Sequence, residues 1–351
     1  MRCLVEDVSP PNPVLIEAID GLCEGHDLDL NRSEAVLLEI MNGRVNQSQV
    51  AGFLIALRAK GETAAELAGL AKAMRSLATR VDCSRTDLVD TAGTGGGNGT
   101  FNVSTTAALI AAGAGCAVAK HGNRSATSLS GSADLLEALG VGLDSDPSLV
   151  ARCIDEVGFG FMFAPAHHPA TRFVVPVRKA LGTRTAFNLL GPLTNPAGAD
   201  RQIIGVSDPA VLKRMAEALV LLGTKRALVI WGTDGVDELS ISAQSLVTEV
   251  RDGVIHEFEV SPEELGLSRA PIETVAGGTP AENAAVTRSV LAGEAGPQRD
   301  LAVINAAAAI LVSGDDSDLS EAARRAEEAI DTGAAGEVLE RLVAMTGGAS
   351  S

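Results

Sequence analysis

The chain has 351 residues, enough for two domains or for one large domain with a sizeable core. Asp and Glu number 45 against 28 for Lys and Arg, so the formal net charge is −17, and aromatic residues make up only 3%. Proteins that bind nucleic acid or anionic membranes need basic surfaces, so this composition argues against both classes. No apolar run approaches the roughly 18 residues of a membrane span. The five cysteines form no CxxC pair, which favours a reduced, cytoplasmic protein.

The N-terminal part of the chain has a helical pattern and no strand pattern. Apolar residues recur at helical spacing over residues 14–77, which predicts short helices with breaks at Gly21, Gly43 and Gly61. We therefore predict an all-helical domain over residues 12–82, preceded by a loose arm.

Two helix starts in this region have recognisable caps. Ser33 is expected to cap one helix, and Thr63 with Glu66 three residues later predicts a capping box.

Strand and helix patterns alternate from residue 83 onward. The predicted strands cover residues 87–91, 117–120, 157–163, 202–206 and 227–231. The predicted helices cover residues 104–112, 132–139, 209–222, 281–293, 298–313, 321–331 and 336–345. A hairpin is predicted around Asp252-Gly253. This alternation is typical of an α/β domain with a mainly parallel central sheet flanked by helices, which we predict over residues 83–351.

The segment GTGGGNGTFNVST, residues 93–105, lies between a predicted strand and a predicted helix. Five of its first seven residues are glycine, so the backbone can approach a ligand closely. Polar residues then begin the helix, where free N–H groups favour an anion. We expect a phosphate or diphosphate site; for the glycines alone, a simple connector is the alternative. The segment has neither the GK[ST] ending of a P-loop nor the acidic residue of a dinucleotide fold.

A second polar segment, Lys120–Gly140, begins where another strand is predicted to end. Parallel strands gather ligands at their carboxyl ends. The residues expected to face the same cleft as the glycine loop are Lys120, His121, Asn123 and Arg124. With the serines that follow, they make a set of donors suited to a phosphorylated sugar; a solvated turn is the alternative.

Two further segments carry candidate residues. Arg178 stands in an apolar setting that suits recognition of a carboxylate, although a single Arg more often lies on the surface. His168 follows a predicted strand, and its neighbour His167 is expected to be an ordinary loop residue. Asp237 and Glu238 follow another strand, and such a pair suits Mg²⁺, although elsewhere it is usually solvated surface.

Together these segments resemble a known family. The glycine loop, KHGNR, SGSADLLEALG, FAPAHHP, RTAFNLLGPLTNP and DGVDE stand in the order seen in the anthranilate phosphoribosyltransferases, which catalyse the second committed step of tryptophan biosynthesis. The resemblance covers nearly the whole chain. It implies a small helical domain, including part of residues 168–195, and a large α/β domain, with the active site in the cleft between them. It also implies a homodimer formed through the helical domain.

The resemblance implies transfer of the phosphoribosyl group of 5-phosphoribosyl 1-diphosphate to the amine of anthranilate, with Mg²⁺ as cofactor. The residues implied to hold the sugar diphosphate are Gly93, Gly96, Gly97, Thr100, Asn102, Val103, Ser104, Thr105, Lys120, Asn123, Ser128 and Ser132. The residues implied to engage anthranilate or line its path are Gly93, His121, Asn123, His168 and Arg178. The implied Mg²⁺ ligands are Ser104, Asp237 and Glu238. No catalytic acid or base is assigned, because positioning and electrostatics are expected to dominate.

One position departs from the family pattern, which has GTGGDG and two further residues before TFN. Here GTGGGNG runs directly into TFN, so the loop is one residue shorter and lacks its Asp, near Gly97 and Asn98. We expect this difference to affect Mg²⁺ and diphosphate binding.

Two alternative functions share the fold. A pyrimidine nucleoside phosphorylase would carry a nucleoside-binding signature, which the chain lacks. A non-catalytic, nucleic-acid-binding relative would carry a basic surface and a broken metal site, contrary to the charge of −17 and to the Asp237-Glu238 pair.

The charge is unevenly distributed along the chain. Residues 91–133 and 157–199 contain no Asp or Glu and carry +2 and +4, so the remainder carries −23. These two windows hold three of the four polar segments. We therefore expect a local positive field in the cleft that favours a diphosphate and a carboxylate.

Overall fold

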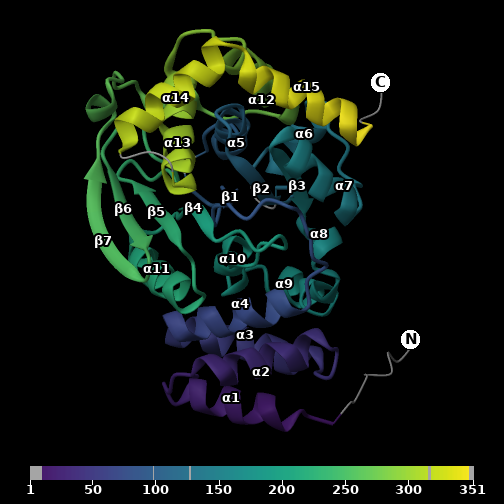
Figure 1. Ribbon diagram of the computed structural model, residues 1–351. Helices are drawn as coiled ribbons and strands as arrows, with labels where there is room; N and C mark the ends of the chain where they lie inside the picture. Colours follow the sequence, from purple (N-terminus) through teal and green to yellow (C-terminus); the bar gives the residue numbers. More distant parts are fainter. Residues whose placement is uncertain (1–9, 98, 126–127, 315–317, 348–351) are drawn as a thin grey trace.

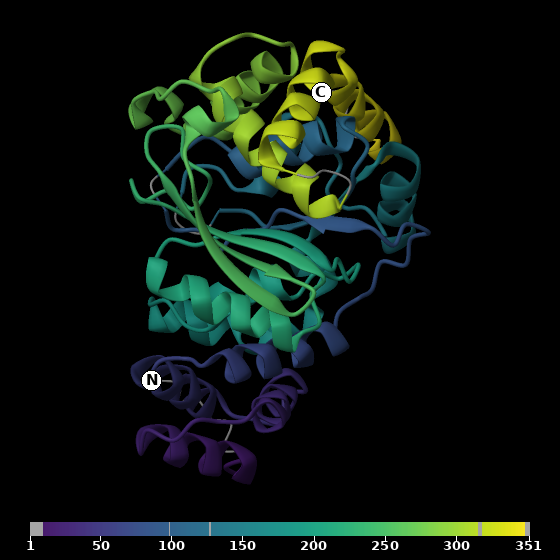
Figure 2. The same ribbon diagram turned by 60° about the vertical axis from the view of Figure 1, so that its left-hand side comes forward.

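The computed structural model contains one seven-stranded sheet between two layers of helices, with an N-terminal helical bundle beside one layer (Figures 1 and 2). The structure describes residues 10–347 except 98, 126–127 and 315–317. Most of the predicted arm, together with Asn98 of the glycine loop, lies outside the described residues. No helix in the described part of the chain is long and apolar enough to cross a membrane.

The N-terminal bundle consists of four helices. They are α1 (Pro13–Cys23), α2 (Leu30–Met41), α3 (Gln47–Lys60) and α4 (Ala64–Ser76). The predicted capping box at the start of α4 is confirmed. Thr63 Oγ1 accepts a hydrogen bond from the Glu66 N–H at 3.2 Å, and Glu66 Oε2 accepts one from the Thr63 N–H at 2.7 Å.

Two predictions for the bundle are wrong. α1 runs through Gly21 and ends before Gly25, because burial of its apolar face outweighs the roughly 1 kcal/mol that one glycine costs a helix. Ser33 is not a cap but a buried residue inside α2. The N-cap is Asp29, whose Oδ1 accepts a hydrogen bond from the Arg32 N–H at 2.8 Å.

The sheet has the strand order β3-β2-β1-β4-β5-β6-β7. Its strands are β1 (Leu88–Asp90), β2 (Ala117–Gly122), β3 (Phe159–Phe163), β4 (Arg201–Gly205), β5 (Arg226–Gly232), β6 (Ser245–Arg251) and β7 (Val254–Val260). β1 to β5 are parallel, and β6 and β7 form the predicted antiparallel hairpin. Its turn is at Asp252 and Gly253, which have φ of 50° and 81°. The chain order reverses between β1 and β4, the place where ligands bind in such sheets.

The two faces of the sheet are covered by different helices. One face packs against α5 (Val103–Gly113), α6 (Ser132–Ala138), α12 (Pro280–Leu291), α13 (Pro297–Ser313), α14 (Leu319–Asp331) and α15 (Ala334–Thr346). On the side of the bundle lie α9 (Val175–Leu181), α10 (Phe187–Leu190) and α11 (Leu212–Leu221). The short helix α8 (Ala164–His167) directly follows β3. A further short helix, α7 (Pro147–Arg152), lies beside β3. The short helices α7 to α10 are absent from the predicted elements because they span too few residues to show a helical period.

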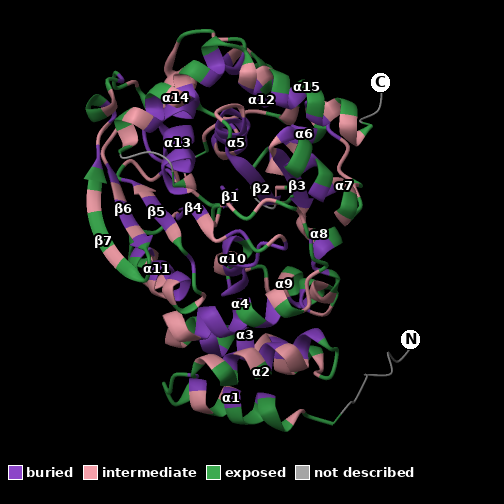
Figure 3. Cartoon of the chain, in the orientation of Figure 1, coloured by how far each residue is buried: buried purple, intermediate pink, exposed green. Residues whose placement is uncertain are grey.

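The bundle and the α/β region share one apolar core. α4 packs against α10 and α11, and α3 packs against α9. Buried side chains of α4, such as Leu67 and Leu70, belong to the same cluster as Val177, Leu190 and Met215. Figure 3 shows buried residues on α4, α10 and α11, where the bundle meets the α/β region. Helices within residues 168–195 therefore contact the bundle directly and connect it to the sheet.

Candidate active site

The candidate residues gather at the carboxyl edge of the parallel strands. The glycine loop follows β1, the Lys120–Gly140 segment begins in β2, and Asp237 and Glu238 follow β5. β2, β1, β4 and β5 are consecutive in the sheet. The strand order therefore brings three segments that are far apart in sequence to one site.

The glycine loop lies directly against Asp237. A Cβ atom on Gly97 would lie 2.4 Å from Asp237 Oδ1, and one on Gly93 would lie 3.6 Å from Oδ2. A Cβ atom on Gly205, at the end of β4, would lie 1.6 Å from the Asp237 carbonyl oxygen. The lack of side chains at these positions is what allows the segment after β5 to approach the loop after β1.

Asp237 and Glu238 form a crowded, partly buried pair of carboxyl groups. Desolvation raises the pKa of Glu238 to about 8, and the charge of Asp237 adds to this effect. Desolvation also raises the pKa of Asp237. Thr100 Oγ1 donates to Glu238 Oε2 at 2.9 Å. A divalent cation would relieve both the repulsion and the desolvation, so the pair fits Mg²⁺.

Protein carboxylates alone would not complete such a metal site. Among the described residues, no group of three or more His, Cys, Asp or Glu side chains is placed to hold a metal ion. Mg²⁺ accepts hydroxyl, water and phosphate oxygens as its remaining ligands. A metal here would therefore need further oxygen ligands besides the two carboxylates.

Lys120 is a buried cation beside this pair. Its side chain is 1% exposed, and Nζ donates to Thr91 O at 3.1 Å, Thr91 Oγ1 at 2.8 Å and Ser104 Oγ at 3.5 Å. Burial lowers the pKa of Lys120 to about 8, against the opposing charges of Asp90 and Glu238. Lys120 is therefore mainly protonated at pH 7. It lies near Ser104 and Glu238, which belong to the two segments predicted to bind the metal.

Asp90 supports the site but is not among the predicted residues. Its side chain is fully buried, with Oδ1 accepting from the His121 N–H at 3.1 Å and Oδ2 accepting from Asn195 Nδ2 at 2.8 Å. Burial raises the pKa of Asp90 to about 6. An acidic residue inside an apolar strand, next to a glycine loop, is the sequence signal that points to it.

His121 and His168 lie side by side, with ring centroids 5.1 Å apart. Burial lowers the pKa of His121 to about 3 and that of His168 to about 4, so both rings are neutral at pH 7. Within the described part of the chain, neither buried Nε2 atom has a hydrogen-bond partner. His167 has a structural contact instead, since its Nδ1 lies 2.8 Å from the Thr79 carbonyl oxygen.

Arg178 is a half-buried cation on α9. Its guanidinium carbon lies 5.3 Å from the centre of the Phe187 ring. Desolvation lowers the pKa of Arg178, and no acidic residue in the described part of the chain opposes that shift. A desolvated guanidinium without an acidic partner is suited to bind the carboxylate of a ligand.

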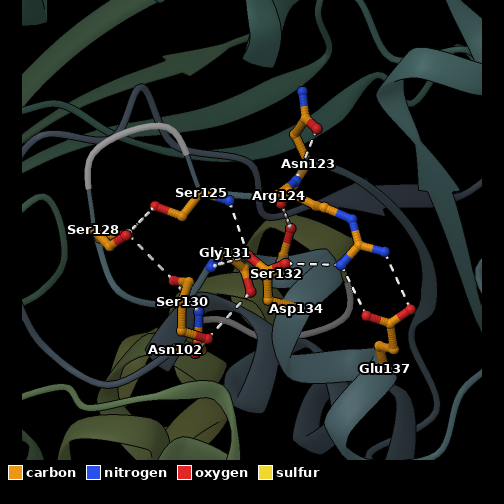
Figure 4. Close-up of polar contacts among 10 residues, drawn as sticks. All are labelled: Asn102, Asn123, Arg124, Ser125, Ser128, Ser130, Gly131, Ser132, Asp134 and Glu137. Atoms are coloured by element: carbon orange, nitrogen blue, oxygen red, sulfur yellow. Dashed lines mark hydrogen bonds and ion pairs between the residues drawn. The ribbon is translucent and has the colours of Figure 1, made fainter.

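Arg124 does not face the cleft as expected. Its Nη1 donates to Asp134 Oδ1 at 2.9 Å and to Glu137 Oε2 at 2.8 Å, so the side chain is bound to α6 (Figure 4). Both acids follow the acid-free window of residues 91–133 and neutralise this Arg. The formal charge of +2 on residues 91–133 therefore overstates the positive charge that this segment supplies in the cleft.

Arg184 is a contact of the glycine loop that the sequence did not reveal. Its Nη2 donates to Gly95 O at 3.3 Å, and a Cβ atom on Gly96 would lie 2.2 Å from its Nη1. Arg58 of α3 in turn donates from Nη1 to the Arg184 carbonyl oxygen at 2.7 Å. A hollow at this junction of the bundle and the glycine loop is lined by Arg58, Glu62, Thr94, Arg184, Thr185 and Asn188, among others.

The remaining predicted residues lie on α5 and on the segment after β2. Val103 and Thr105 are buried in α5. The Asn102 amide is already hydrogen-bonded to protein groups, whereas Asn123 and Ser128 are exposed and Ser132 begins α6.

Comparison with known proteins shows the family. Residues 16–78 match the helical bundle domain of a glycosyl transferase family, and residues 85–336 match its a/b domain. An anthranilate phosphoribosyltransferase from Symbiobacterium thermophilum is 56% identical over 322 residues, covering 92% of this chain and 94% of the relative. The chain belongs to the anthranilate phosphoribosyltransferase family. Another relative of that name, from Roseiflexus sp., is 50% identical and covers 95% of this chain and 98% of the relative.

Solved structures of anthranilate phosphoribosyltransferases share this fold. The enzyme from Thermus thermophilus has a TM-score of 0.89 and 47% identity, covering 94% of this chain and 99% of that chain. The Saccharomyces cerevisiae enzyme in complex with PRPP and Mg has a TM-score of 0.87 and 30% identity, covering 96% and 98%. The predicted fold class, a small helical domain with a mainly parallel α/β domain, is confirmed.

Proposed function

We propose that this chain transfers the phosphoribosyl group from 5-phosphoribosyl 1-diphosphate to the amine of anthranilate, giving N-(5-phosphoribosyl)anthranilate and diphosphate in tryptophan biosynthesis. One observation carries this proposal: the glycine loop, the Asp237-Glu238 pair and Lys120 meet at one edge of the sheet. They do so in a chain that is 56% identical to an anthranilate phosphoribosyltransferase over 322 residues.

The sugar diphosphate would bind between the glycine loop and the segment after β2. Gly95 and Gly96 have φ of 66° and 94°, a backbone conformation that glycine adopts readily. α5 begins directly after this loop, so its N-terminal N–H groups favour a phosphate there. The buried ammonium group of Lys120 supplies positive charge in a water-poor setting, where it stabilises developing negative charge most effectively.

Mg²⁺ fits this site. A yeast relative has been solved with PRPP and Mg, and here Ser104, Asp237 and Glu238 offer oxygen ligands of the kind Mg²⁺ prefers. When bound, Mg²⁺ supplies positive charge that stabilises the leaving diphosphate. Gly97 lies against Asp237, with no space for a side chain.

Arg178 would bind the anthranilate carboxylate and so orient the amine toward C1 of the ribose. A yeast relative has been solved with 4-fluoroanthranilate, an analogue of that substrate. The neutral rings of His121 and His168 leave two ring nitrogens free to contact a ligand. An aromatic amine is a weak base that attacks in its neutral form, so no strong general base is needed, and positioning dominates.

We propose further that the protein is a cytoplasmic homodimer. α1 and α3 leave apolar side chains on the surface of the bundle, namely Val14, Ile16 and Ile55, which are 38–45% exposed. A second copy of the bundle would cover such a surface. No disulfide joins the four described cysteines, which is compatible with a reducing compartment. The acidic composition gives no reason to propose a nucleic-acid or membrane partner.

The proposed function is tested by the fluorescence of anthranilate, which is lost when its amine is ribosylated. Purified protein with anthranilate and phosphoribosyl diphosphate should give a steady decay that EDTA abolishes and excess Mg²⁺ restores. Absence of decay, together with phosphorolysis of thymidine or uridine, would support the nucleoside phosphorylase alternative instead.

A further inference from the structure

One carboxylate, that of Asp134, joins both ends of the loop between β2 and α6. Its Oδ2 accepts from the Ser125 N–H at 2.9 Å and from the Gly131 N–H at 2.9 Å (Figure 4). Its Oδ1 accepts from Arg124 Nη1 at 2.9 Å. Ser125 lies near the start of this loop and Gly131 is its last residue, so Asp134 links the two sides of the loop at its base. We call this arrangement of Arg124, Ser125, Gly131 and Asp134 the loop tie.

The ends of the loop are also in close backbone contact. A Cβ atom on Gly131 would lie 2.4 Å from Ser125 N and 2.6 Å from Asn123 O. Because Gly131 has no side chain, its backbone can lie directly against the backbone of Asn123 and Ser125. Although partial burial works against it, the Ser125 and Gly131 N–H groups and the Arg124 guanidinium hold the pKa of Asp134 below its usual value. Asp134 is thus a charged acceptor at neutral pH.

Two further contacts hold the Arg124 side chain in place. Glu137 accepts from Nη1 at 2.8 Å and from Nη2 at 3.1 Å, a two-pronged ion pair. The guanidinium carbon also lies 5.9 Å from the centre of the Phe163 ring on β3. The tie is therefore fixed to α6 and to the sheet, and Arg124 contributes to it rather than to the cleft.

The same loop is bonded to the start of α5. Ser130 Oγ donates to Asn102 Oδ1 at 2.8 Å, and Asn102 Nδ2 donates to Ser130 O at 3.1 Å. Asn283 Nδ2 of α12 donates to the same Asn102 oxygen at 2.8 Å. A displacement of Ser130 would therefore be felt at the end of the glycine loop, so the two loops at the ligand edge are mechanically linked.

We propose that Asp134 is a positioning residue for the sugar diphosphate: it holds the loop that carries Ser128, and the start of α6 that carries Ser132, in the binding geometry without touching the ligand. This inference rests on the proposed function. A loop that is held in place before binding loses little conformational entropy when the ligand arrives. Without the tie, the ligand would have to order the loop, and that cost would fall mainly on the sugar diphosphate, to which Ser128 and Ser132 are assigned.

Three variants test this role, with kinetics measured for both substrates. Asp134→Ala removes every bond of the tie and should raise KM for phosphoribosyl diphosphate about tenfold, with KM for anthranilate changed less than about twofold. Asp134→Asn keeps one oxygen that can accept from both N–H groups but loses the charge, and should raise the same KM about threefold.

The matched control is Asp146→Ala. Asp146 is the N-cap of α7 and also accepts from two backbone groups, the Ser148 N–H at 2.8 Å and the Leu149 N–H at 3.0 Å, but it is exposed and is not part of the site. This variant should leave both KM values unchanged. An equal rise in both KM values for Asp134→Ala, or the same kinetic effect from Asp146→Ala, would overturn the positioning role.

Amide hydrogen exchange without substrate tests the tie independently of activity. The Ser125 and Gly131 amides should exchange faster in Asp134→Ala than in the unaltered protein, and Asp134→Asn should be intermediate. Unchanged exchange would overturn the tie; faster exchange with an unchanged KM for phosphoribosyl diphosphate would overturn its role in binding. If the unaltered protein is inactive but Asp134→Ala still speeds exchange of the Ser125 and Gly131 amides without substrate, the result counts against the proposed function. The loop tie itself would then stand.

Discussion

Arg178 is the residue expected to distinguish the two substrates. Replacing it with Ala should raise KM for anthranilate about thirtyfold, equivalent to about 2 kcal/mol for a lost charged hydrogen bond, and should leave KM for phosphoribosyl diphosphate within about twofold. Arg178→Lys should fall between, since Lys keeps the charge but not the two-pronged geometry.

The control for Arg178 is Arg172→Ala. Arg172 has a similar stacking contact, its guanidinium carbon lying 4.8 Å from the centre of the Phe173 ring, but it is exposed. Steady-state kinetics should show no substrate-selective effect for this variant. If Arg178→Ala changed both KM values equally, Arg178 would not be the carboxylate-binding residue.

Gly97 tests the contact between the glycine loop and Asp237. Because its Cβ would lie 2.4 Å from Asp237 Oδ1, Gly97→Ala must displace that carboxylate. We expect the Mg²⁺ concentration for half-maximal activity to rise about tenfold, the effect of weakening one charged ligand by about 1.4 kcal/mol.

Gly99→Ala is the control in the same loop, since among the described residues no atom beyond the chain neighbours lies within 4 Å of a Cβ built there. Its Mg²⁺ titration should match that of the unaltered protein. An unchanged titration for Gly97→Ala as well would show that the contact with Asp237 does not matter for the metal.

At the scale of elements, a single buried acid organises the helical bundle. Glu66 is fully buried, with Oε1 accepting from the Leu28 N–H at 2.9 Å and Oε2 accepting from the Thr63 N–H at 2.7 Å and from Lys60 Nζ at 3.0 Å. Glu66→Ala should lower the free energy of unfolding by about 3 kcal/mol, because it leaves buried donors without an acceptor. Urea denaturation followed by circular dichroism measures this loss.

The matched control is Glu282→Ala in α12. Glu282 makes the same capping-box bond, accepting from the Thr279 N–H at 2.8 Å, but it is exposed to water. Its replacement should cost much less, because water can satisfy the released N–H group. Equal losses for the two variants would mean that Glu66 acts only as a cap.

Helices, strands and turns were predicted correctly where the apolar pattern was long or where the turn residues were characteristic. The Thr63-Glu66 box and the Asp252-Gly253 turn are local devices, and both occur as predicted. Ser33 was misassigned because Asp29, four residues earlier, supplies a competing cap. α9 and α10 were missed since each is short and is stabilised by packing on the bundle rather than by its own period.

At the scale of the whole molecule, buried histidines make stability depend on pH. The folded pKa of His168, about 4, lies below its ordinary value of 6.5, so its contribution is complete above pH 6.5 and is lost as the pH falls below that value. Between pH 7 and 5 this loss is about 2 kcal/mol. Asp90 and Glu238, whose pKa values are raised, act in the opposite direction over this range.

The test therefore compares variants rather than absolute stability. On acidification from pH 7 to 5, His168→Gln should lose about 2 kcal/mol less free energy of unfolding than the unaltered protein. His256→Gln removes an exposed His and should follow the unaltered protein. A pH dependence of His168→Gln identical to that of the unaltered protein would mean that His168 is not neutral in the fold.

The sequence by itself determined the fold class and the family, because helical and strand periods, turn residues and the order of motifs are written locally along the chain. It also placed Lys120 and the Asp237-Glu238 pair at strand ends. Only the tertiary structure decided which charges act in the cleft. Arg124 is captured by two acids of α6, and Arg184 reaches the glycine loop. Such contacts depend on the direction of side chains and on strand order, and neither can be deduced from spacing along the chain.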